Sequence, residues 1–315
     1  DKYYNGVADY KIQLLPSAGD SDPNVVTRAK SGNLDYGYTK MVADVQALEG
    51  TPGITVTPID VRYTRLFYLN KFDKKDGSPA PLADVRVRQA LRYAIDMETI
   101  CETLFQGSAV PANALAPDAN LKGGDLNDYN YNPEKAKELL AEANWDPNTV
   151  IKAVYYYTDQ ATVDLMTAVQ AYLADVGIKM EFELVEGDLA TILWAAPADQ
   201  TNGPRAVDWD ICYAANAALS LHEYYDRYRT GSPTNSHTPE DAELNRLIDA
   251  TNASADVNAQ NEAFKELIKY ENENLFTMAL YYQPIFLITS DKIGDIQKGT
   301  PQFCINWDIQ NWNVQ

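Results

Sequence analysis

The adjacent residues His222 and Glu223 are the pair in this sequence that most resembles a catalytic base with an orienting carboxylate. Neighbouring side chains point in different directions on a helix or a strand, so the two are poorly arranged to orient each other. No GxSxG, HExxH or GxxxxGK[ST] motif occurs in the chain, and nothing in the sequence assigns the pair a serine or cysteine nucleophile. We therefore interpret the pair as part of an exposed loop.

A second short segment partly matches a calcium-binding loop. Asp118, Asn120 and Gly123 occupy the first, third and sixth positions of that motif. Lys122 stands at the fifth position and Tyr129 at the twelfth, where oxygen ligands are required. The segment therefore does not predict a calcium site.

Histidines and cysteines are too few and too dispersed for other metal sites or for a disulfide framework. The chain has two histidines and three cysteines, and the cysteines form no CxxC pair. Cys212, in the apolar segment WDICYAA, is expected to be a small buried hydrophobic residue. The sequence thus predicts no metal and no cofactor. A hydrolase of peptides or glycans stays open as an alternative, because 45 acidic residues offer many carboxylate pairs and their spacing selects none.

Charge and composition narrow the class of partner. Lys and Arg number 26 against 45 Asp and Glu, giving a formal net charge of −19, which disfavours nucleic-acid binding. No run of eighteen apolar residues occurs, and the N-terminal DKYYNGVADYK lacks the apolar core of a signal peptide. We therefore expect either a cytoplasmic protein or one whose leader has been removed.

The segment PLADVRVRQALRYAID predicts a helix that carries three arginines and no reactive group. Asp84 is the expected N-cap, and the apolar residues that follow it fall on one helical face. Arg92 lies four residues from both Arg88 and Asp96, so we expect it to pair with Asp96 and to repel Arg88. Arginines near a helix start oppose the helix dipole, which predicts carboxylate partners for some of them elsewhere in the fold.

Helices and strands alternate along the rest of the chain. A strand over 150–157, a helix ending at Gly177 and a strand over 178–186 predict a βαβ unit. Further helices are expected over 97–106, over 132–143 with Asn132 as cap, over 239–253 with Thr238 as cap and over 257–272, before a strand-rich tail. We interpret the tyrosine runs 155–157 and 281–282 as strand residues. The chain is predicted to be an α/β protein.

The segments PLADVRVRQALRYAIDMETI and YNPEKAKELLAEANW resemble motifs of the extracellular solute-binding proteins of family 5, as do SGNLDYG and the terminal INWDIQNW. The resemblance extends over essentially the whole chain. It implies a periplasmic-binding-protein-like fold of class II type, with a large C-terminal lobe plus part of the first lobe. By this resemblance residues 1–67 form the partial lobe I, 68–286 the large lobe and 287–315 a return segment, and the chain corresponds to the C-terminal portion of a longer protein.

The resemblance also carries over a set of candidate ligand-binding residues. They come from the loop Tyr213 to His222, the strand after SGNLD and the expected crossing between lobes: Tyr213, Ala215, Asn216, Ala217, Leu219, Ser220, His222, Tyr36, Tyr38, Arg62 and Tyr63. Arg62 and Arg65 could equally form hinge salt bridges. Peptide-binding members carry an aspartate in this loop that pairs with the peptide amino terminus. Leu219 or Ser220 stands near that position here, which weighs against peptides with a free amino group.

The resemblance implies a receptor that captures a solute between two lobes and makes or breaks no bond. The expected solute is small and polar, with a peptide preferred, and the expected partners are the transmembrane subunits of an ABC permease. The protein is expected to be a monomer, extracellular or periplasmic, and anchored to the membrane through a removed N-terminal segment. Besides the hydrolase, a ligand-free sensory or structural module on the same fold stays open.

Overall fold

The computed structural model describes residues 11–15, 24–116, 121–216, 220–295 and 312–315, without the side chains of 59–63. The chain divides into two compact units, unit 1 (Asp1–Tyr63 and Gln283–Gln315) and unit 2 (Thr64–Tyr282). Both boundaries lie four residues before the predicted lobe boundaries, at 67/68 and 286/287. The assignment of these units to two lobes stays a prediction.

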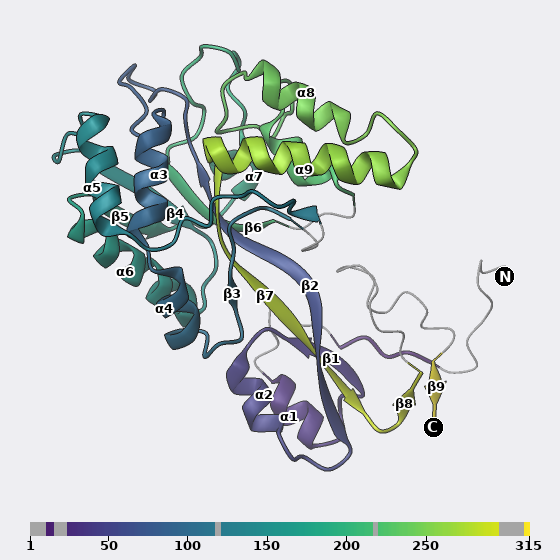
Figure 1. Ribbon diagram of the computed structural model, residues 1–315. Coiled ribbons are helices and arrows are strands. Elements are labelled where there is room, and N and C mark those ends of the chain that lie inside the picture. The colour runs from purple at the N-terminus through teal and green to yellow at the C-terminus, as the bar shows by residue number, and fades with distance from the viewer. Residues whose placement is uncertain (1–10, 16–23, 117–120, 217–219, 296–311) are drawn as a thin grey trace. The chain divides into compact units, whose positions relative to one another are not determined.

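Unit 2 is built on a mixed sheet with the strand order β7-β2-β6-β4-β5, and β3 pairs with the outer side of β7 (Figure 1). The strands are β2 (Ile54–Leu69), β3 (Val110–Pro111), β4 (Val150–Tyr155), β5 (Lys179–Leu184), β6 (Ile211–Asn216) and β7 (Thr277–Ser290). The predicted βαβ unit is confirmed, because β4 and β5 are parallel and α6 (Gln160–Asp175) lies between them in the chain. β6 is also parallel to β4, whereas β2 is antiparallel to β6.

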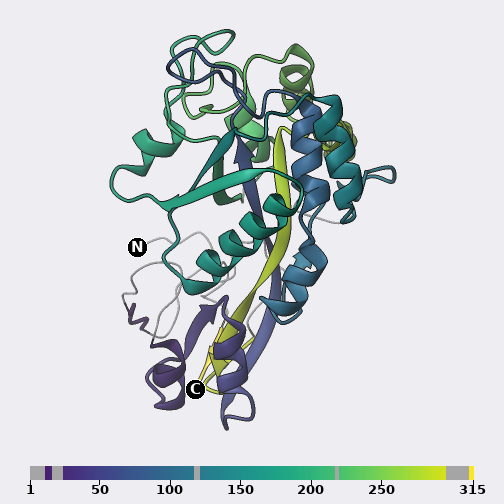
Figure 2. The same ribbon diagram turned by 90° about the vertical axis from the view of Figure 1, so that its left-hand side faces the viewer.

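Helices cover both faces of this sheet. One face carries α3 (Val85–Ala94), α4 (Met97–Thr103), α5 (Pro133–Glu142) and α6, and Figure 2 views the molecule from that side. The other face carries α7 (Leu189–Trp194), the 3-10 helix η2 (His222–Tyr228), α8 (Ala242–Ala250) and α9 (Val257–Asn274). Successive residues of β2 alternate between the two cores: Phe67 and Leu69 enter the first, Leu66 and Tyr68 the second.

Most predicted helix starts are confirmed by their caps. The Asp84 side chain accepts a hydrogen bond from the Arg86 amide, and Asn132 accepts one from Lys135 with Pro133 in the first turn. The predicted cap Thr238 is wrong, because α8 begins at Ala242 and its cap is Asp241.

The physical reason is that Thr238 is already engaged in a buried loop. Its amide donates to the Asn235 side chain, and its hydroxyl lies 2.7 Å from Nδ1 of His237. The helix predicted over 97–106 is also shorter than expected. α4 ends at Thr103, and the chain reverses direction through positive φ angles at Gln106 and Gly107.

The arginines of α3 correct a prediction. Arg88 and Arg92 are each 5% exposed and donate to backbone carbonyls, not to carboxylates. Arg88 bonds the carbonyls of Leu82, Ala83 and Asn274, and Arg92 bonds those of Tyr129 and Ala112. Carbonyls that end loops and helices need donors when buried, and a guanidinium offers five N–H groups.

The other three charged residues of that segment, Asp84, Arg86 and Asp96, have local roles. Asp96, the expected partner of Arg92, instead caps α4 by accepting from the amide of Thr99. Arg86 forms a half-exposed ion pair with Asp84. The arginines are therefore scaffold groups, as their lack of a reactive neighbour suggested.

Unit 1 is smaller and has its own apolar core. Its elements are α1 (Val25–Lys30), β1 (Tyr36–Thr39), α2 (Val42–Leu48) and the two-residue strands β8 (Ile293–Gly294) and β9 (Asn313–Val314), together with the ends of β2 and β7 that lie in this unit. β1 pairs antiparallel with residues 286–289 of β7. Val25, Ala29, Leu48 and Ile288 form the core. Among the described residues, no helix is long and apolar enough to cross a membrane.

Arg88 and Arg86 give a matched comparison of a buried and an exposed guanidinium. We expect Arg88→Met to lower the free energy of unfolding by about 3 kcal/mol, because three buried carbonyls lose their donors. Arg86→Met removes a half-exposed ion pair and should cost less than about 1 kcal/mol. Urea unfolding of both variants measures the difference. Equal destabilisation by the two substitutions would contradict this account of α3.

Glu271 is a buried carboxylate of unit 2, at 2% exposure. Its Oε1 accepts from the amide of Thr277, and Lys71 and Arg88 act on it electrostatically. Burial raises the pKa of Glu271 to about 7, an effect that the Thr277 N–H and the two cations only partly offset. Between about pH 4.5 and pH 7, the Glu271 carboxyl is therefore still protonated in the native state, whereas the unfolded chain, in which its pKa is 4.5, has lost this proton.

The pH dependence of stability follows from this difference. As pH rises from about 4.5 to about 7, the unfolded state releases its proton first, so Glu271 progressively reduces stability. We expect the stability of the wild-type protein relative to Glu271→Gln to fall over this window by on the order of 3 kcal/mol. Denaturant titrations at several pH values test this, with the exposed Glu273→Gln as control. Parallel pH curves for wild type and Glu271→Gln would overturn the assignment.

Candidate functional site

The parallel strands of unit 2 bring several chain turns to one edge of its sheet, called here the carboxyl edge. β4, β5 and β6 end there at Tyr155, Leu184 and Asn216, and antiparallel β2 enters unit 2 at the same edge, where Thr64 pairs with Asn216. Ligands of open α/β sheets bind at the carboxyl ends of strands, where the loops leave the sheet. This edge is therefore the first place to look for a binding site.

Arg65 and two tyrosines form a stack at the carboxyl edge. The guanidinium carbon of Arg65 lies 4.5 Å from the centroid of the Tyr157 ring, and the ring of Tyr156 lies 4.4 Å from that of Tyr157. The hydroxyls of the two tyrosines are 3.0 Å apart. Arg65 is 7% exposed, so its charge is largely removed from water and its interaction with the ring is stronger than at an open surface.

Tyr213 supports this stack from the core. Its hydroxyl lies 2.7 Å from that of Tyr281, and its ring meets Phe67 and Tyr157 edge-on. Burial raises the pKa of Tyr213 to about 12, which keeps the phenol neutral and able to donate. Tyr213 is 1% exposed, because β6 alternation directs its side chain into the core. Its role toward a solute stays a prediction.

The other candidates of this loop lie at or just beyond the end of β6. Ala215 and Asn216 are half-buried, and the Asn216 amide donates to the carbonyl of Tyr224, which ties the end of β6 to η2. Ser220 is exposed and His222 is half-buried at the start of η2. Ala217 and Leu219 lie outside the described residues. The loop thus contributes small and polar groups to the carboxyl edge.

A second cation lies on an aromatic ring near the other face of the same sheet. The guanidinium carbon of Arg227, on η2, is 4.1 Å from the ring centroid of Trp194 at the end of α7, and Trp194 meets Tyr68 edge-on. Neither this pair nor the role of Tyr157 was predicted from the sequence. Asp159 was the available signal for Tyr157: it caps α6, so the strand had to end before the third tyrosine of the run.

The remaining candidates, Tyr36, Tyr38, Arg62 and Tyr63, belong to unit 1. Tyr36 and Tyr38 lie two residues apart on β1, so their side chains point to the same face of the strand. Tyr36 packs on Trp312 at a ring distance of 4.8 Å, and burial raises its pKa to about 12. Tyr38 is 44% exposed. The side chains of Arg62 and Tyr63 lie outside the described residues, although their backbone belongs to β2.

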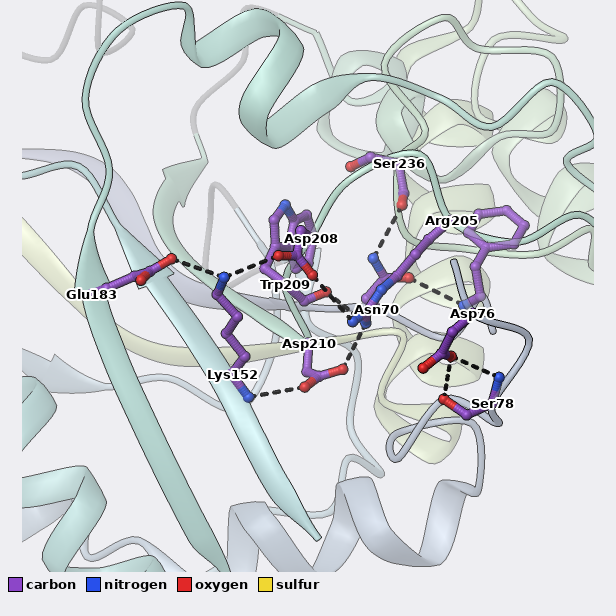
Figure 3. A network of polar contacts seen from close by, with 11 residues as sticks. Asn70, Asp76, Ser78, Lys152, Glu183, Arg205, Asp208, Trp209, Asp210 and Ser236 are labelled. Carbon is purple, nitrogen blue, oxygen red and sulfur yellow. Dashed lines mark hydrogen bonds and ion pairs between the residues drawn. The ribbon is translucent and has the colours of Figure 1, made fainter. Parts of the chain in front are cut away.

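The amino ends of β4 and β6 carry a different polar group, shown in Figure 3. Lys152 contacts Glu183 and Asp208, and its backbone amide donates to Asp210. Arg205 forms a buried ion pair with Asp210 at 2.6 Å. These carboxylates are held by cations and a backbone amide, so the network fixes the loop before β6 and offers no free acid pair for hydrolysis.

Comparison with known proteins now bears on this geometry. The family model for bacterial extracellular solute-binding proteins, family 5, middle region, matches residues 10–238. The chain belongs to this family. Heme-binding protein A of Haemophilus influenzae is 35% identical over 130 residues, which cover 40% of this chain and 22% of that protein. The dipeptide-binding protein of Escherichia coli is 48% identical over 64 residues, covering 20% of this chain and 12% of that protein.

A solved structure confirms the fold of this family 5 chain. The ABC transporter substrate binding protein CtaP of Listeria monocytogenes matches with a TM-score of 0.77 at 16% sequence identity. The match covers 93% of this chain and 58% of the Listeria chain, so the present chain spans little more than half of that protein. The predicted α/β fold of periplasmic-binding-protein type is thereby confirmed.

The hydroxyl pair beneath Arg65 can be tested by a double-mutant cycle. Tyr213→Phe and Tyr281→Phe each leave one buried hydroxyl unpaired, whereas the double variant removes both. We expect each single variant to cost about 1–2 kcal/mol and the double variant to cost about 1 kcal/mol less than their sum.

Tyr131 and Tyr172 provide the control cycle, because their rings meet edge-on at 5.6 Å. Tyr131→Phe and Tyr172→Phe should be additive in the free energy of unfolding. Additive effects at Tyr213 and Tyr281 would contradict the hydrogen bond between them.

Proposed function

We propose that this chain contributes the solute-contacting carboxyl edge of an extracellular receptor for an ABC importer. The single observation that carries the proposal is the position of Arg65 over Tyr157 beside the last residues of β6, Ala215 and Asn216, at the edge where parallel strands end, in a member of family 5. A planar cation, aromatic rings and loop amides can bind a small polar solute, and no described group there is arranged to cleave one.

The relatives support a solute-binding role and leave the solute open. Family members are named for dipeptide binding in Escherichia coli and heme binding in Haemophilus influenzae. A single scaffold therefore serves different solutes, and the solute must be inferred from the residues at the edge. We propose a peptide-like or other small polar solute, permease transmembrane subunits as partners, a monomeric state, and an extracellular or periplasmic location with membrane anchoring.

The hydrolase alternative has less support among the described residues. Asp210 is buried against Arg205, and Asp208 and Glu183 share Lys152. Glycoside cleavage needs a carboxylate pair that faces the substrate. A chain that turned over peptides or glycans, and lost that activity on substitution of one acid, would establish the alternative in place of the proposal.

A thermal-shift screen of this chain against short peptides, N-acetylated peptides, neutral sugars, sugar acids and metal chelates tests the proposal. A true ligand at a hundred times its dissociation constant should add about 2.7 kcal/mol of stability. Tyr157→Ala should weaken binding of that ligand by about tenfold because a stacking surface is lost, whereas Tyr131→Ala, which removes an aromatic contact with Tyr172 of α6, should leave binding unchanged. Failure of every class to stabilise the chain would count for a ligand-free module.

A further inference from the structure

Arg65 has a defined place on the sheet. It lies on β2 opposite Ala215 of β6, and two residues before Phe67, which pairs with Tyr213. Alternation therefore directs Arg65, Ala215, Phe67 and Tyr213 to one face. Phe67 and Tyr213 are core residues there, whereas Arg65 and Ala215 come one step nearer to the carboxyl edge. Because Ala215 carries only a methyl group, the cross-strand neighbour of the guanidinium is small.

The ring of Tyr157 fixes the orientation in which this cation is presented. Its face lies 4.5 Å from the guanidinium carbon. Stacking on a ring engages the flat face of a guanidinium and leaves its N–H groups directed outward in the plane. That fork matches the two oxygens of a carboxylate, and such pairs are strongest where both charges are shielded from water. Arg65 also has further interactions within the chain, and a bound carboxylate would add to these interactions or replace one of them.

Among the described residues, one cation, Arg65, and one carboxylate, Asp159, are the charged groups that act on the tyrosines at this position. Asp159 acts electrostatically on Tyr213 and Tyr281, as Arg65 does. Both carboxylate oxygens of Asp159 are used within α6, on the amide and the hydroxyl of Thr162. The chain carries a net charge of −19, so attraction of an anion requires a local cation of this kind.

We propose that Arg65 determines the substrate class: the solute carries a carboxylate, and the Arg65 guanidinium, held by Tyr157, binds it. This inference rests on the proposed function. Peptides with a free carboxyl terminus and sugar acids fit the chemistry, and amidated peptides and neutral sugars do not.

Matched probes that differ only in this group test the inference. N-acetyl-dialanine and N-acetyl-trialanine, each as free acid and as amide, and glucuronic acid against glucose are titrated by calorimetry. For the pair that binds, the wild-type chain should prefer the acid by about tenfold or more. Arg65→Met should reduce this ratio to about one by weakening the acid alone, and Arg65→Lys should retain part of it, about threefold.

Arg229→Met is the control, because Arg229 forms an exposed ion pair with Asp249 away from β2 and should leave the ratio unchanged. Thermal unfolding verifies that Arg65→Met is folded, and Arg65→Lys carries the test if it is not. Equal binding of acid and neutral forms by wild type, or an unchanged ratio in the Arg65 variants, overturns this inference alone. Absence of binding by every pair, with metal chelates and other solutes also inactive, overturns the proposed function as well.

Discussion

β4 lies between β5 and β6 and runs parallel to both, and this pairing constrains what the rest of unit 2 can do. Parallel strands end at the same edge, so the turns after Tyr155, Leu184 and Asn216 collect there. β2 is antiparallel to β6, which brings its first residues of unit 2, Thr64 and Arg65, to the same place. Groups that are far apart in sequence thereby become neighbours. The opposite edge holds the ion pairs of Lys152 and Arg205, which fix loops.

The buried cations of this acidic protein are held by different kinds of partner. In the scaffold, Arg88 and Arg92 donate hydrogen bonds to the carbonyls of loop and helix ends, and Lys71 donates to the carbonyls of Leu69 and Phe276. At the carboxyl edge, the guanidinium carbon of Arg65 instead lies over the ring of Tyr157. Carbonyl-bound cations are committed to structure, because removing them leaves buried acceptors unpaired.

The parts of the fold that could be read from sequence are those set by local chemistry. Cap residues such as Asp84 and Asn132 predict helix starts, because their side chains accept hydrogen bonds from amides of the first turn. The β4–α6–β5 crossover is predicted by hydrophobic periodicity. Thr238 failed as a cap because a buried loop used its groups first, a tertiary effect with no local signal.

The candidate site was less accessible to sequence for the same reason. The resemblance predicted ligand contacts in the loop after β6. The side chain of Tyr213 lies in the core, because strand alternation directs it to the face that α6 covers. Tyr157 and Arg65, some ninety residues apart, meet only through the sheet. Neither residue carries a motif, so their pairing could not be predicted from spacing. Contacts of this kind depend on the pairing register of the strands, which cannot be read from the sequence of a single chain.

The central claim is that solute contacts the carboxyl edge of unit 2. Hydrogen–deuterium exchange of this chain, with and without the solute that stabilises it most, measures this directly. The account predicts that protection concentrates in the backbone around Arg65, in the turn after Tyr155 and in the segment from Tyr213 to His222. Protection centred instead on the opposite edge, around Lys152 and Arg205, with the carboxyl edge unchanged, would contradict it.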